Sequence, residues 1–159
     1  MRGVLAGYPL VDFKVELFDG SYHTVDSNEQ SFKMAGILAF KAVAPKCRPV
    51  LLEPLDEVEV LAPDDYMGDV LGDLSSRRGH ILGTEVVEDS LGAMTGYTRI
   101  KAIVPQSELH LYASTLQSMT QGRATYVRRF KGYEEMPNEV AQRVITEHAK
   151  EKEEELVSV

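Results

Sequence analysis

Residues 56–88 read DEVEVLAPDDYMGDVLGDLSSRRGHILGTEVVE and contain the pattern that decides the fold. Val58 and Val60 alternate with acidic side chains, which predicts a strand with one buried face. After Pro63, apolar residues recur every three or four positions, which predicts a helix. Gly79 closes this helix, and a second strand follows it. The stretch therefore predicts a strand-helix-strand unit.

The same order occurs again in the residues that follow. We expect strands over 97–104 and 124–133, with a helix between them that Ser107 caps and Gly122 closes. The block from Glu53 to Tyr133 is then β-α-β-β-α-β, which is typical of a ferredoxin-like sandwich with both helices on one face of an antiparallel sheet. In that topology the two turns that follow the helices lie at opposite ends of the sheet.

The residues before this block form a different pattern. Residues 11–18 alternate between apolar and polar side chains and predict a strand. A capping-box pattern at Ser27 opens a helix that Pro45 ends, and a short strand is expected near 50–52. One strand, one helix and a short strand cannot close a core by themselves. We therefore expect that further residues belong before Met1.

The sequence divides into three parts of an α+β chain. Residues 1–52 form an incomplete α+β half-domain, and residues 53–133 form the ferredoxin-like domain. Residues 134–159 form a C-terminal helix, capped by Asn138, that runs into an acidic tail.

Composition restricts the cellular setting. No apolar run approaches the roughly 20 residues that a membrane helix needs, and no signal-peptide pattern follows Met1. The single cysteine, Cys47, excludes a disulfide framework and fits a reducing compartment. These features predict a cytoplasmic protein without membrane contact.

Charge is unevenly distributed along the chain. The net charge is −8, yet residues 77–133 hold 8 basic and 4 acidic side chains, whereas residues 53–76 hold 8 acidic and no basic ones. A basic stretch can present a local positive face to nucleic acid. A solvated surface of mixed charge fits the same composition, and charge by itself favours that interpretation.

Motifs for nucleotide, metal or covalent chemistry are absent from the sequence. It has no Gly-x-x-x-x-Gly-Lys-Ser/Thr loop, no Gly-x-Gly-x-x-Gly and no His-Glu-x-x-His. Its four histidines fall in four different predicted elements, and none has a second ligand at metal spacing. We therefore expect no catalytic residue and no metal ligand in this chain.

A polar cluster follows the first predicted strand. Gly20, Ser21, Tyr22 and His23 lie in a loop before a capped helix. A hydroxyl group, an aromatic ring and an imidazole can stack on a base and hydrogen-bond phosphate or ribose. When the cluster is viewed alone, its composition favours an ordinary polar loop.

Basic residues also accompany aromatic ones in the last predicted strand. Arg128 and Arg129 are consecutive, so they point to opposite faces of that strand, and at most one can join a single RNA-facing row. Arginine beside aromatic rings supports contact with single-stranded RNA. Charges that protect an edge strand from aggregation explain the pattern equally well.

Longer stretches resemble elongation factor G. Residues 11–27, VDFKVELFDGSYHTVDS, resemble the second half of that family's domain IV. Residues 66–79, YMGDVLGDLSSRRG, and residues 120–124, TQGRA, resemble its domain V, a ferredoxin-like module. The similarity extends from about Gly7 to Pro137, so it covers most of the chain.

The resemblance implies a role in translation. The family uses GTP to move tRNA and mRNA through the ribosome, and the loop of residues 20–23 would face the tRNA and mRNA in the decoding region. Arg77, Arg78 and Arg123 would contact ribosomal RNA. GTP and magnesium belong to a GTPase domain that is outside this chain, so the resemblance implies neither a cofactor nor enzymatic activity here.

Two other function classes compete with this interpretation. A free-standing ferredoxin-like module could serve in regulation or ligand binding, because the fold alone does not select a function. An enzyme in its own right is disfavoured, because the sequence shows no paired nucleophile and base. Since residues 1–52 lack sheet partners, we also expect the chain to self-associate through them.

Overall fold

The computed structural model describes residues 3–157 and separates into two compact units. One unit is Leu52–Glu135, and the other is formed by Met1–Leu51 together with Met136–Val159. No helix among the described residues is long and apolar enough to cross a bilayer.

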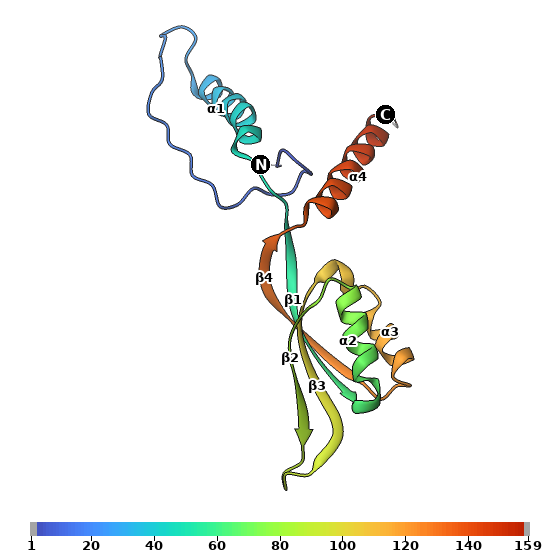
Figure 1. Cartoon of the computed structure of the whole chain (residues 1–159). Coiled ribbons are helices and arrows are strands. Elements are labelled where there is room, and N and C mark those ends of the chain that lie inside the picture. The colour runs from blue at the N-terminus through green and yellow to red at the C-terminus, as the bar shows by residue number, and fades with distance from the viewer. Residues whose placement is uncertain (1–2, 158–159) are drawn as a thin grey trace. The chain divides into compact units, whose positions relative to one another are not determined.

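The Leu52–Glu135 unit is an antiparallel sheet with two helices (Figure 1). Its elements are β1 (Leu52–Pro63), η2 (Asp64–Tyr66), α2 (Met67–Ser76), β2 (His80–Glu88), β3 (Met94–Pro105), η3 (Gln106–Leu109), α3 (Tyr112–Met119) and β4 (Thr125–Glu135). The strand order in the sheet is β2-β3-β1-β4, and every neighbouring pair is antiparallel. The predicted α+β, ferredoxin-like class is therefore confirmed.

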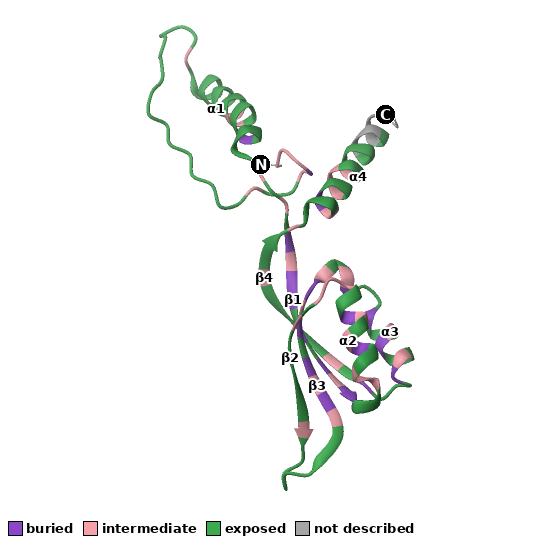
Figure 2. Cartoon of the chain, viewed as in Figure 1, coloured by how far each residue is buried: buried purple, intermediate pink, exposed green. Residues whose placement is uncertain are grey.

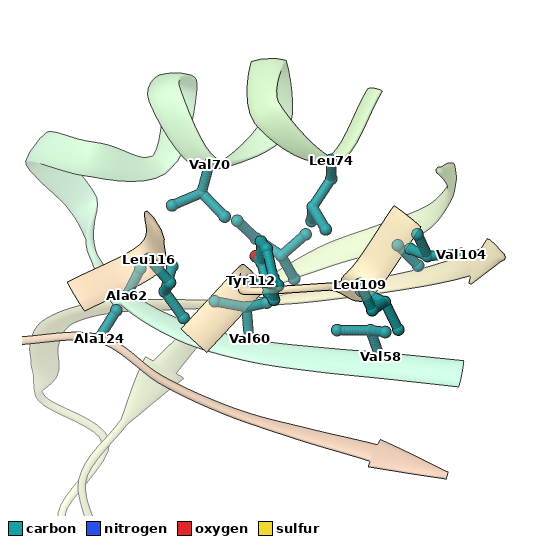
Figure 3. Packing of buried hydrophobic residues seen from close by; sticks show 12 residues of the cluster. Val58, Val60, Ala62, Val70, Leu74, Val104, Leu109, Tyr112, Leu116 and Ala124 are labelled. Atoms are coloured by element: carbon teal, nitrogen blue, oxygen red, sulfur yellow. The ribbon is translucent and has the colours of Figure 1, made fainter. Parts of the chain in front are cut away.

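The core lies between the sheet and the two helices. Val58 and Val60 of β1 have no exposed surface, because every second residue of the strand turns toward the helices. Val70 and Leu74 of α2 pack against them, as does Tyr112 of α3 (Figure 3). Burial of such side chains contributes about 1.5–3 kcal/mol each, so this layer supplies most of the unit's stability.

Both helices end in the same kind of turn. Arg78 and Gln121 adopt left-handed φ angles of 59° and 53°, and a glycine follows each of them. The amide of Gly79 donates to the carbonyl of Leu74 at 2.8 Å, and the amide of Gly122 makes the equivalent bond, also at 2.8 Å. A Cβ at Gly79 would lie 2.5 Å from that carbonyl oxygen, so only glycine fits there.

These turns lie at opposite ends of the sheet, as predicted. Arg78 contacts Glu53 near the start of β1, whereas Arg123 contacts Tyr66, just beyond the end of that strand. No single small ligand could reach both turns.

The start of α3 differs from the sequence prediction. Ser107 is predicted to cap this helix, but it lies inside η3 and caps nothing. The chain then turns at Leu111, whose φ is 56°, and α3 begins one residue later. Two short elements thus replace one longer helix, because the left-handed residue interrupts the hydrogen-bond ladder.

The other unit contains α1 (Glu29–Val43), η1 (Ala44–Cys47) and α4 (Asn138–Val157). The N-cap of α1 is Asn28, whose side chain accepts a hydrogen bond from the amide of Ser31 at 2.9 Å. The predicted cap at Ser27 is therefore wrong by one residue. No residue of α1 is buried (Figure 2).

The strand predicted over residues 11–18 is absent. Those residues form irregular chain without ladder hydrogen bonds, because no neighbouring strand lies beside them in the described part of the chain. The short strand predicted near 50–52 is not a separate element either. Leu52 instead begins β1, where it pairs with Glu135.

Candidate RNA-facing surface

The tip loop, residues 20–23, is exposed along its whole length. Two hydrogen bonds fix the chain where it leaves the loop toward α1. The amide of His23 donates to Ser27 Oγ at 2.8 Å, and the amide of Ser27 donates to the carbonyl of His23 at 3.0 Å. The Tyr22 side chain is 65% exposed. The loop therefore presents an aromatic ring and an imidazole to solvent from an ordered turn.

Arg77 is directed into its own unit. Its Nε lies 2.8 Å from the Asp73 carboxylate, one helical turn earlier, and one terminal nitrogen donates to the carbonyl of Glu108 at 2.6 Å. The guanidinium also covers the Tyr112 ring, with 5.1 Å between its central carbon and the ring centroid. These contacts link α2 to α3 and leave only 18% of the side chain exposed.

Arg78 is enclosed by two carboxylates. Both terminal nitrogens donate to Glu53, each at 2.8 Å, and Nε donates to Glu108 at 3.0 Å. The hydrogen bonds to Glu53 raise the pKa of Arg78, although partial burial acts in the opposite direction. The Glu53 side chain is only 7% exposed, so this pair joins β1 to the turn after α2. We call Glu53, Arg78 and Glu108 the carboxylate clasp.

Arg123 has a different environment. Its guanidinium lies over the Tyr66 ring at 4.9 Å from the centroid and donates to the Tyr66 hydroxyl at 2.9 Å. Among the described residues no carboxylate forms an ion pair with it, and the residue is exposed. Stacking on Tyr66 fixes the plane of the guanidinium while several of its N–H donors stay open to solvent.

The consecutive arginines of β4 point to opposite faces, as predicted. Arg128 pairs in register with Val58, and its Nε lies 3.8 Å from the buried Asp56 carboxylate. Arg129 pairs in register with Glu57, on the sheet face that the helices leave open. The two residues therefore do not build one basic row.

Sequence reasoning finds the three arginines but misses the groups that hold them. Asp73 stands four residues before Arg77, so helical spacing could have indicated that pair. Glu53 and Tyr66 lie 25 and 57 residues from their arginines, and no local pattern indicates such contacts. The contact of Arg77 and Arg78 with RNA stays a prediction, and their geometry favours a structural role.

Comparison with known proteins establishes the family. Residues 50–144 match the model described as elongation factor G C-terminus. The chain belongs to the elongation factor G family. Residues 1–48 match a second model, elongation factor G, domain IV.

Individual relatives agree with this assignment. Elongation factor G of Aquifex pyrophilus is 53% identical over 146 residues, which are 92% of this chain and 20% of that protein. A crystal structure from Thermus thermophilus shares 42% identity and a TM-score of 0.76, covering 94% of this chain and 22% of the other. The chain thus spans about a fifth of the length of these relatives. These matches do not favour a free-standing regulatory or ligand-binding module.

Proposed function

We propose that this chain is the ribosome-contacting, C-terminal part of a translation elongation factor G-like GTPase that promotes GTP-dependent translocation of tRNA and mRNA. The observation that carries the proposal is the succession of two elongation factor G models along the chain, over residues 1–48 and 50–144. The GTP and magnesium needed for translocation would be bound by another part of the parent. In this proposal the chain works in the cytoplasm and supplies contacts rather than catalysis.

The tip loop supports the part of this role that concerns tRNA and mRNA. It is exposed, it is tied to the start of α1, and it offers a ring for stacking and an imidazole for hydrogen bonding. We assign the contact with the tRNA–mRNA region to residues 20–23, with His23 as the principal side chain.

Arg123 supports the contact with ribosomal RNA. Several of its donors are open to solvent and its plane is fixed by Tyr66, which suits a phosphate group. Arg77 and Arg78 use most of their donors inside the unit, so we assign them mainly to holding the shape of the turn that they occupy.

The first prediction concerns His23 in the full-length parent. We expect His23→Ala to slow single-round translocation about tenfold, which corresponds to about 1.4 kcal/mol on the barrier. The matched control is His110→Ala, since His110 is also exposed but lies outside the tip loop and outside the contacts of Arg123. A His23→Ala rate within about twofold of the parent would contradict the role of the tip loop, and we expect His110→Ala to stay within that limit.

A further inference from the structure

The outer end of the β1–β4 pair is a two-stranded ribbon. We call residues 52–55 of β1 and 132–135 of β4, which pair with each other, the outer ribbon. The neighbouring strand β3 ends at Pro105, opposite Leu55, so within the described part of the chain no third strand lies beside the ribbon beyond that point (Figure 1). A ribbon of two strands is marginally stable in water unless it packs on something else.

The root of the outer ribbon is a β-bulge. Leu55 pairs with Gly132, and the next residue of β1 pairs with Phe130. Lys131 is therefore left without a partner in β1. A bulge bends the strand that carries it and increases the local twist. Strand pairing thus attaches the ribbon to the sheet without fixing the direction in which it leaves.

The carboxylate clasp connects the outer ribbon to the rest of the unit. Glu53 lies in the ribbon with its side chain 7% exposed, and both of its carboxylate oxygens accept hydrogen bonds from Arg78 at 2.8 Å. Arg78 follows α2, and its Nε donates to Glu108 of η3. Two parallel hydrogen bonds constrain the orientation of a side chain as well as its distance. The clasp therefore ties the ribbon to two elements that lie outside it.

The backbone that presents Arg78 is itself fixed. The residue has a left-handed φ of 59°, and the amide of the following Gly79 donates to the carbonyl of Leu74 at 2.8 Å. Leu74 has no exposed surface and belongs to the hydrophobic core. The arginine is thus anchored to the core, and it can hold the ribbon against a rigid body.

Both connections to the other unit leave from the outer ribbon. The unit boundaries fall between Leu51 and Leu52 and between Glu135 and Met136. The amide of Met136 donates to the carbonyl of Leu51 at 2.8 Å, which continues the pairing by one step. A change in the direction of the ribbon therefore moves both connections together. The tip loop belongs to the unit that they carry.

We propose that Arg78 is a positioning residue, which acts through Glu53 to hold the outer ribbon in one direction and thereby orients the unit that carries the tip loop. The second part rests on the proposed function, because the tip loop needs a fixed direction only if it meets the tRNA–mRNA region. In this role Arg78 serves two carboxylates of its own unit and not a phosphate group of RNA. The proposal also accounts for a buried carboxylate at the start of the ribbon, since Glu53 is costly there unless it is paired.

The direction of the ribbon can be measured in the full chain. Cys47 is exposed, so the background is Cys47→Ser. Nitroxide labels are attached at Glu135→Cys in the ribbon and at Ser118→Cys in α3, two exposed positions. Double electron–electron resonance then gives the distribution of distances between the ribbon and the body of the unit.

The clasp variants should broaden this distribution. We expect a width about twofold larger for Arg78→Lys, because lysine keeps the charge, and with it the fold, but cannot make two parallel bonds. Glu53→Gln should broaden it to a similar extent. The matched control is Glu57→Gln, exposed and four residues further along β1, which should leave the width unchanged. A clasp that only stabilised the unit would leave the folded distribution unchanged in all three variants.

Translocation by the full-length parent tests the consequence. We expect Arg78→Lys and Glu53→Gln each to slow single-round translocation about fivefold at a saturating concentration of the parent, while the affinity for the ribosome stays within about twofold. The double variant should be no slower than the slower single variant, because both changes break the same contact. If Arg78 instead binds an RNA phosphate, Glu53→Gln should free the arginine and leave translocation as fast as before.

The outcomes separate this proposal from the proposed function. Unchanged distributions in Arg78→Lys and Glu53→Gln would overturn the proposal whatever the translocation rates are. Broader distributions with normal translocation would also overturn it, provided that His23→Ala slows translocation, and the ribosomal role would then stand. If His23→Ala is normal as well, the role of the tip loop fails, whereas broader distributions would still support the hold of Arg78 on the ribbon.

Discussion

At the scale of single residues, Arg78 is fixed by two carboxylates from distant parts of the sequence. It takes a left-handed φ of 59° and still brings its guanidinium to Glu53 and Glu108. A buried carboxylate is costly unless it is paired, so Glu53 depends on this arginine more than the arginine depends on it. The positive charge of Arg78 is therefore largely neutralised by carboxylates of its own unit.

The carboxylate clasp gives the second prediction. We expect Arg78→Met to lower the free energy of unfolding by about 2 kcal/mol, because the Glu53 carboxylate is then buried without a partner. The loss is smaller than for a fully enclosed ion pair, because Arg78 is partly exposed. Urea denaturation, monitored by circular dichroism, measures this free energy. The control Arg129→Met, on an exposed part of β4, should cost less than about 0.5 kcal/mol. Equal losses for the two variants would show that the clasp does not stabilise the unit.

At the scale of elements, the turn between β2 and β3 is held by the Asp89 carboxylate as well as by backbone hydrogen bonds. Asp89 Oδ1 accepts hydrogen bonds from the amides of Leu91 and Ala93 at 2.8 and 2.9 Å. The bonds from Ala93 and then Leu91 lower the pKa of Asp89 from its ordinary value of 3.8. The charged form of Asp89 is thus favoured in the folded chain. Its contribution to the free energy of unfolding is therefore present above pH 3.8 and is lost as the pH falls through the lowered pKa.

The third prediction follows from this turn. In an NMR titration, the amide protons of Leu91 and Ala93 should shift together with a midpoint below pH 3.8. The same protons in Asp89→Asn should show no such transition, because an amide does not titrate in this range. A midpoint at or above 3.8 would mean that the hydrogen bonds to Asp89 do not favour its charged form.

The elements that could be predicted from sequence are those whose signals lie within a few residues of one another. The alternation around Val58 and the glycine at position 79 predict β1 and the end of α2, because both features act within a few residues. Residues 11–18 carry an equally clear alternation and yet form no strand, since a ladder needs a neighbour that the pattern cannot specify. The candidate site behaves in the same way: Arg123 could be predicted, whereas its partner Tyr66 could not.

At the scale of the whole molecule, burial is concentrated in one unit. The described hydrophobic core cluster lies entirely between Val58 and Ala124. Outside Leu52–Glu135, the buried hydrophobic residues among those described are three alanines, Ala6, Ala44 and Ala141. Alanines add little to stability when buried, so the cooperative unfolding of the chain should be that of Leu52–Glu135.

The last prediction tests this division. A shortened chain of residues 52–135 should fold by itself and unfold in urea with a free energy within about 1 kcal/mol of the full chain, because it retains the whole core cluster. Its urea m-value should fall only slightly, since the removed residues expose little additional surface on unfolding. In the full chain, α1 should lose helicity gradually, before the main transition, because none of its residues is buried. A shortened chain that is unfolded, or a full chain in which α1 melts together with the sheet, would show that the two units stabilise each other.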